Sequence, residues 1–114
     1  MKVVINQCYG GFDLSDKAFE RYFELKGIAF ESVLKYGNRL YFKAGHLDDD
    51  NYYLSEYDIE RNDPALVQVV EEMLHEANSQ YSSLKVVEIP DDVKWYIDEY
   101  DGWEKIHEEH RTWF

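Results

Sequence analysis

An Asp-Gly dipeptide near the C-terminus, Asp101-Gly102, constrains the fold of this chain more than any other short feature. Asp-Gly suits the two-residue turn between antiparallel strands, because both positions of that turn adopt a positive φ angle. A turn at this dipeptide fixes the register of residues 93–109. The register in turn determines which side chains lie opposite one another.

The register gives four favourable cross-strand pairs and one repulsive pair. The favourable ones are an aromatic pair, two pairs of opposite charge and an aliphatic pair: Tyr100 with Trp103, Asp98 with Lys105, Lys94 with Glu109, and Ile97 with Ile106. Each contributes roughly 0.2 to 1 kcal/mol, and together they outweigh the repulsion of Glu99 and Glu104. We predict a β-hairpin over residues 93–109. The alternative is a helix capped by Asp101, which would place His107 and His110 on one side.

Other segments also carry patterns of regular structure. Residues 2–6 and 84–89 are apolar runs that predict buried strands, and residues 39–43 alternate like a strand. One helix is predicted from a cap at Asp13 or Ser15 to Gly27. A second begins with Asp63 as its cap and Pro64 as its first residue. The secondary structure of residues 28–36 stays open.

Length and composition indicate one folded domain. A chain of 114 residues can bury a stable core without disulfides or metals. Hydrophobic residues make up 45% of it, and glycine and proline together number only eight, which argues against disorder. We predict a single α+β domain over residues 1–114, with a small mixed sheet, two main helices and a C-terminal β-hairpin.

The sequence predicts a cytoplasmic protein without a cofactor, a metal or an enzymatic activity. Cys8 is the only cysteine, so no intramolecular disulfide can form. No segment approaches the ~18 apolar residues of a membrane helix. His107 and His110 are too few for a zinc site, and no Ser-His-Asp elbow is present. We expect no action at a membrane.

The charge of the chain is large and uneven. Twenty-four acidic and twelve basic residues give a net charge of −12. Residues 1–57 carry nine acids and seven bases, a net −2, whereas residues 58–114 carry fifteen and five, a net −10. Such a charge disfavours nucleic acid and favours a basic partner, although solubility also explains it. The candidate partner-binding residues are acids and nearby tyrosines: Glu71, Glu72, Glu76, Tyr96, Asp98 and Tyr100.

Several segments of the chain resemble small acidic proteins of tailed bacteriophages and prophages. The segments are KVVINQCYGGF, RNDPALVQVVEE, LKVVEIPDDV, and the ending EYDG with HRTW, about half of the chain. The resemblance implies a viral accessory protein in the bacterial host cytoplasm, and it supplies no catalytic residue. With the charge, it leads to the hypothesis of a non-enzymatic protein that binds or inhibits a host protein, one of defence or of nucleic-acid handling. The oligomeric state stays open, a homodimer included.

An alternative hypothesis is a site for a phosphate or nucleotide signal. Its candidate residues lie in the segments that carry the resemblance: Gly10, Gly11, Arg61, His110 and Arg111. Free amides at the start of a helix can hold an anion. The glycine turn lacks the spacing of nucleotide-binding loops, however, and Asp13 and Asp16 would repel a second negative charge.

Overall fold

A computed structural model describes residues 1–109 of the chain, and it has the α+β architecture that the sequence predicts. Its helices are α1 (Asp16–Lys26) and α2 (Pro64–Met73). Its strands are β1 (Lys2–Asn6), β2 (Phe30–Lys35), β3 (Asn38–Lys43), β4 (Tyr53–Leu54), β5 (Leu84–Glu88), β6 (Trp95–Tyr100) and β7 (Trp103–Glu108). Three short 3-10 turns are η1 (Asp50–Tyr52), η2 (Glu56–Asp58) and η3 (Leu74–Ala77).

The strands form three small antiparallel sheets, so the prediction of one mixed sheet is wrong. Strand β1 pairs with β5, β2 and β4 flank β3, and β6 pairs with β7. At the end of β1, the N–H of Asn6 donates to the Glu104 carboxylate of β7 at 2.8 Å. Side chains therefore join the hairpin to β1 at this point, where a larger sheet would use backbone carbonyls.

The structure confirms the predicted C-terminal hairpin and its register. Tyr100 faces Trp103, Asp98 faces Lys105 and Ile97 faces Ile106 across a turn at Asp101-Gly102. The helical alternative for these residues is wrong. Residues 28–36, which sequence patterns left open, contain strand β2 and lead into a second hairpin with β3.

The predicted helix ends are also confirmed. The hydroxyl of Ser15 accepts the N–H of Ala18 at the start of α1, and Gly27 ends that helix in the left-handed region. Asp63 caps α2 by accepting the N–H of Ala65. Each cap satisfies a backbone group that the helix itself leaves without a partner.

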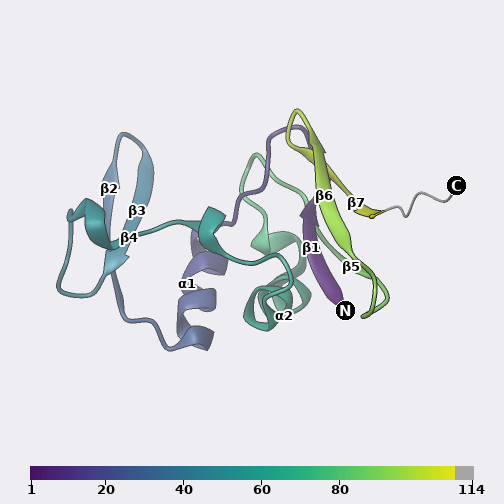
Figure 1. Cartoon of the computed structure of the whole chain (residues 1–114). Coiled ribbons are helices and arrows are strands. Elements are labelled where there is room, and N and C mark those ends of the chain that lie inside the picture. The colour runs from purple at the N-terminus through teal and green to yellow at the C-terminus, as the bar shows by residue number, and fades with distance from the viewer. Residues whose placement is uncertain (110–114) are drawn as a thin grey trace, which may run out of the picture.

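The molecule is elongated, with principal extents of 56 × 27 × 27 Å. The sheet β2–β3–β4 lies at one end and the β6–β7 hairpin near the other, with α1 and α2 between them (Figure 1). The helices and β1 meet in a core whose fully buried residues include Val4, Ala18, Leu66 and Val69. None of the helices within residues 1–109 is long and apolar enough to cross a bilayer.

Candidate functional site

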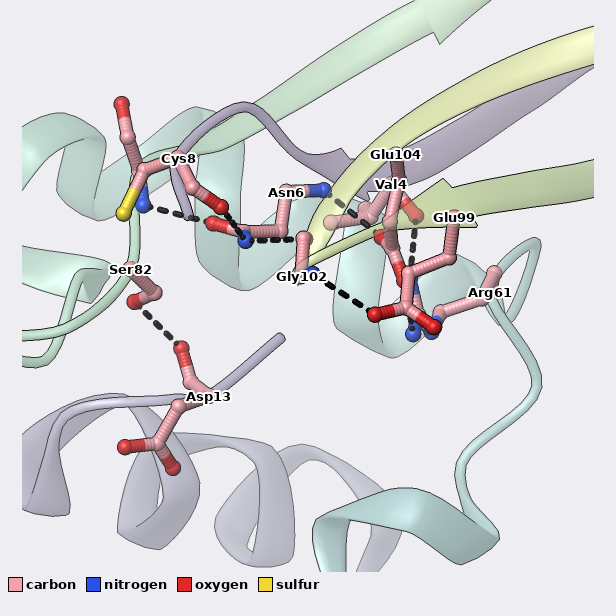
Figure 2. Close-up of polar contacts among 10 residues, drawn as sticks. Val4, Asn6, Cys8, Asp13, Arg61, Ser82, Glu99, Gly102 and Glu104 are labelled. Carbon is pink, nitrogen blue, oxygen red and sulfur yellow. Dashed lines mark hydrogen bonds and ion pairs between the residues drawn. The ribbon is translucent and has the colours of Figure 1, made fainter. Parts of the chain in front are cut away.

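The inner face of the β6–β7 hairpin carries a buried ion pair between Glu104 and Arg61. Two guanidinium nitrogens of Arg61 donate to the two carboxylate oxygens of Glu104 at 2.6 and 2.8 Å (Figure 2). The same guanidinium lies 3.6 Å from the centre of the Phe12 ring. Only 5% of Glu104 is exposed, so removing either partner would leave an uncompensated charge away from water.

Asn6 connects this ion pair to the hairpin turn. Its side chain is fully buried, and its amide nitrogen donates to the carbonyl oxygens of Cys8 and Gly102 at 2.7 and 2.8 Å (Figure 2). Its amide oxygen accepts the N–H of Ser83 at 2.8 Å. Directional bonds thus tie the hairpin turn to β1 and to the loop before β5. The hairpin is held in one orientation on the body of the protein.

The network also explains why the hairpin tolerates two facing glutamates. Glu99 and Glu104 stand opposite one another, as the register predicts. Glu104 accepts hydrogen bonds from Arg61, and Glu99 accepts the N–H of Gly102 at 2.6 Å. Both carboxylates therefore have hydrogen-bond donors of their own, which offsets the repulsion expected from the sequence.

The Gly10-Gly11 turn packs closely against the rest of the molecule. A Cβ atom on Gly10 would overlap the carbonyl oxygen of Tyr81, and one on Gly102 would overlap the backbone nitrogen of Gly11. The Sγ of Cys8 also donates to the carbonyl oxygen of Tyr81, at 3.0 Å. The turn therefore acts as a packed connector between the loop before β5 and the hairpin turn.

These contacts bear on the predicted phosphate or nucleotide site. Gly10 and Gly11 have the packing role just described, and the charge of Arg61 is balanced by Glu104. His110 and Arg111 lie outside the described residues. The described members of the candidate set therefore bring no uncompensated positive charge to an anion.

The outer face of the hairpin gathers three of the predicted partner-binding residues. Tyr96, Asp98 and Tyr100 alternate along β6 and point away from Arg61, and the two tyrosines are 50% and 75% exposed. The Tyr96 ring stacks on the imidazole of His107 with centroids 5.5 Å apart. A carboxylate oxygen of Asp98 lies 3.4 Å from Nε2 of the same histidine.

A pocket of about 380 Å³ opens on this outer face. It is lined by three aromatic side chains and two charged ones: Tyr9, Tyr100, Trp103, Asp98 and Lys105. The ring of Tyr9, which comes from the loop after β1, packs on Trp103 with centroids 5.1 Å apart and planes at 53°. Sequence reasoning placed Trp103 opposite Tyr100 but missed Tyr9, because no local pattern links residue 9 to the hairpin.

The three predicted glutamates near the end of α2 form a different environment. Glu71 pairs with Lys2 at 2.9 Å, and both carboxylate oxygens of Glu72 accept from Arg21 at 2.9 and 3.1 Å. The hydrogen bonds from Arg21 lower the pKa of Glu72. Glu76 is exposed on η3. Bases of the N-terminal half therefore neutralise two of these acids, which partly offsets the charge split along the sequence.

A second pocket, of about 450 Å³, contains a pair of carboxyl groups that sequence reasoning did not single out. Glu56 on η2 and Asp13 before α1 both line it and are hydrogen-bonded to each other. Burial and this hydrogen bond raise the pKa of Glu56 to about 9, while the N–H of Leu14 opposes the shift. The protonated form of Glu56 is therefore favoured in the folded protein. The two residues are far apart in the sequence, so no spacing could have revealed them.

Within residues 1–109, no group of three or more histidine, cysteine or acidic side chains is arranged to hold a metal ion. Comparison of the chain with protein-family models, curated proteins and solved structures finds no match. The resemblance to bacteriophage proteins thus stays a prediction from sequence.

Proposed function

We propose that this protein is a non-enzymatic accessory protein of a bacteriophage that binds a basic host protein through the outer face of its β6–β7 hairpin. The observation that carries the proposal is the exposed group of Tyr96, Asp98 and Tyr100 on a firmly held hairpin. Tyrosines bury a large area at a low cost in side-chain entropy, which is why they are enriched in binding surfaces.

The charge of the whole hairpin segment, residues 91–109, supports a basic partner. Residues 91–109 contain eight acids and two bases, a net −6, which is half of the net charge of the whole chain. Two of these acids form ion pairs with groups outside residues 91–109: Asp91 with the N-terminal ammonium and Glu104 with Arg61. The remaining acids keep their negative field, which speeds the approach of a positive surface and weakens as salt rises.

Rigidity supports the same face. The inner ion pair and the hydrogen bonds of Asn6 hold the hairpin before any partner arrives. A surface that is already ordered loses little conformational entropy on binding. Glu71 and Glu72 of α2 are left out of the proposed contact, because each would first have to release Lys2 or Arg21.

The test is a comparative capture from host lysate with immobilised wild-type protein and two variants. The hairpin variant is Tyr96→Ala with Tyr100→Ala, and the control is Tyr36→Ala, which alters a fully exposed tyrosine at the opposite end of the molecule. We expect the hairpin variant to lose the protein that wild type and control retain, and higher salt to weaken retention. Equal retention by wild type and the hairpin variant would refute the proposal.

A further inference from the structure

The pocket on the outer face combines aromatic rings with a carboxylate, as an arrangement on the inner face also does. On the inner face the guanidinium of Arg61 lies over the Phe12 ring and donates two hydrogen bonds to the carboxylate of Glu104 in the hairpin. On the outer face, Tyr9, Tyr100 and Trp103 supply aromatic surfaces and Asp98 supplies the carboxylate. We infer that this pocket binds one arginine side chain of the partner, an inference that rests on the proposed function.

The shape and chemistry of the pocket favour a guanidinium. A volume of about 380 Å³ accommodates a single long side chain. Tyr9 and Trp103 line the pocket with aromatic surface, and cation–π attraction and stacking both favour a flat cation beside such rings. A carboxylate accepts two parallel hydrogen bonds from arginine, whereas the lysine ammonium is a compact point charge.

Two neighbours of Asp98 determine how accessible its carboxylate is. His107 lies 3.4 Å from it, and Lys105 stands opposite it in the register and also lines the pocket. The ammonium of Lys105 is a positive charge at the rim, so it opposes an incoming cation. Removing that ammonium should therefore strengthen arginine binding, whereas a lysine with only a structural role would give no such gain.

The probe is a short acetylated and amidated peptide, Gly-Gly-Arg-Gly-Gly, titrated into the full chain and followed at the indole N–H of Trp103 by NMR. Trp103→Phe assigns that resonance. We expect a saturable shift with a millimolar dissociation constant, and no shift with the neutral citrulline peptide. Lys105→Gln should tighten binding, and Asp98→Asn should weaken it at least tenfold. Tyr36→Ala should leave it unchanged.

The inference fails if the arginine and citrulline peptides give the same response, or if Asp98→Asn binds like wild type. It also fails if a trimethyl-lysine peptide binds more tightly than the arginine peptide. The peptide response can be absent while capture of the partner still depends on Tyr96 and Tyr100. That result overturns the arginine pocket and leaves the proposed function standing. If the hairpin variant captures the partner as well as wild type does, the proposed function is overturned, whether or not the peptide binds.

Discussion

The chain contains two hairpins with the same turn geometry and different attachments. Each joins two six-residue strands through two residues of positive φ, Tyr36-Gly37 in β2–β3 and Asp101-Gly102 in β6–β7. The Tyr36-Gly37 turn stands in solvent, with Tyr36 fully exposed. The Asp101-Gly102 turn packs on the backbone of Gly11. The same local structure is therefore a free tip in one region and is packed against a neighbouring loop in the other.

The inner faces of the two hairpins differ as well. Tyr41 and Phe30 attach β2–β3 to α1 mainly by aromatic packing, with the Tyr41 ring 5.1 Å from Phe19 and 5.6 Å from Phe23. One hydrogen bond, from the Tyr41 hydroxyl to Glu20 at 2.8 Å, adds to this packing. Strands β6 and β7 instead attach through the charged pair of Glu104 and Arg61. Apolar packing tolerates small shifts, whereas forked hydrogen bonds specify one geometry. The β6–β7 hairpin is therefore better suited than β2–β3 to present a fixed outer surface.

The largest expected effect contrasts a buried with an exposed ion pair. Glu104→Ala leaves Arg61 charged and unpaired inside the protein, and we expect it to lower the free energy of unfolding by about 3 to 5 kcal/mol. Lys35→Ala breaks the half-exposed pair with Asp48 on the other hairpin, for a loss of at most about 1 kcal/mol. Urea denaturation followed by tryptophan fluorescence measures both. Similar losses would show that the inner ion pair does not anchor β6–β7.

The next contrast concerns the turn glycines. Gly37→Ala adds strain at a φ of 81° but meets open space, so we expect a loss of roughly 1 to 2 kcal/mol. Gly102→Ala has a similar φ of 89°, and its new Cβ also overlaps the backbone of Gly11, which adds about 1 to 3 kcal/mol. The same urea titration checks the difference. If Gly102→Ala proved no worse than Gly37→Ala, the close packing of the second turn would be disproved.

A smaller effect concerns the carboxyl pair in the pocket between the two regions, which is lined by Arg39 of β3 and by Tyr81 beside the Gly10 turn. The folded pKa of Glu56, about 9, exceeds its ordinary value of 4.5. Burial is the main cause, and the carboxyls of Asp13 and Asp16 add to it. Between these pH values the folded protein keeps a proton that the unfolded chain has lost. Stability should therefore fall as pH rises through this window.

Thermal melts of Glu56→Gln across this pH range test that linkage. The amide cannot ionise, so we expect a flatter profile than wild type and a higher melting temperature at pH 8. Glu60→Gln, an exposed neighbour, is the matched control and should reproduce the wild-type slope. A Glu56→Gln profile as steep as that of wild type would show that another group controls this pH dependence.

The smallest expected effect on stability is at the exposed tyrosines. Tyr100→Ala and Tyr36→Ala each remove a ring that is mostly in solvent, and we expect both to stay within about 0.5 kcal/mol of wild type. Their binding behaviour should nevertheless differ, because only Tyr100 lines the outer pocket. A large loss of stability in Tyr100→Ala would assign that side chain a structural role and remove it from the proposed contact surface.

Sequence reasoning located one of the two hairpins. Asp-Gly is a common type I′ turn, and the side chains around Asp101 gave a register that the structure confirms. Tyr36 is an unusual residue at positive φ, so the sequence did not identify Tyr36-Gly37 as the two central residues of a turn. Similarly, the partner-binding candidates Tyr96, Asp98 and Tyr100 all lie in β6. The alternation of side chains along a strand is enough to place them on one face. Tyr9 reaches the same pocket from the other end of the chain.

The sequence by itself determined the features that depend on neighbours along the chain: the caps of α1 and α2, the first and fifth strands, and the register of β6 with β7. Only the tertiary structure decided which charges are neutralised. Glu104 meets Arg61, Glu72 meets Arg21 and Asp13 meets Glu56 across 43 to 51 residues. Caps and turns depend on backbone groups a few residues away, whereas the environment of a charge depends on whatever the folded chain brings beside it.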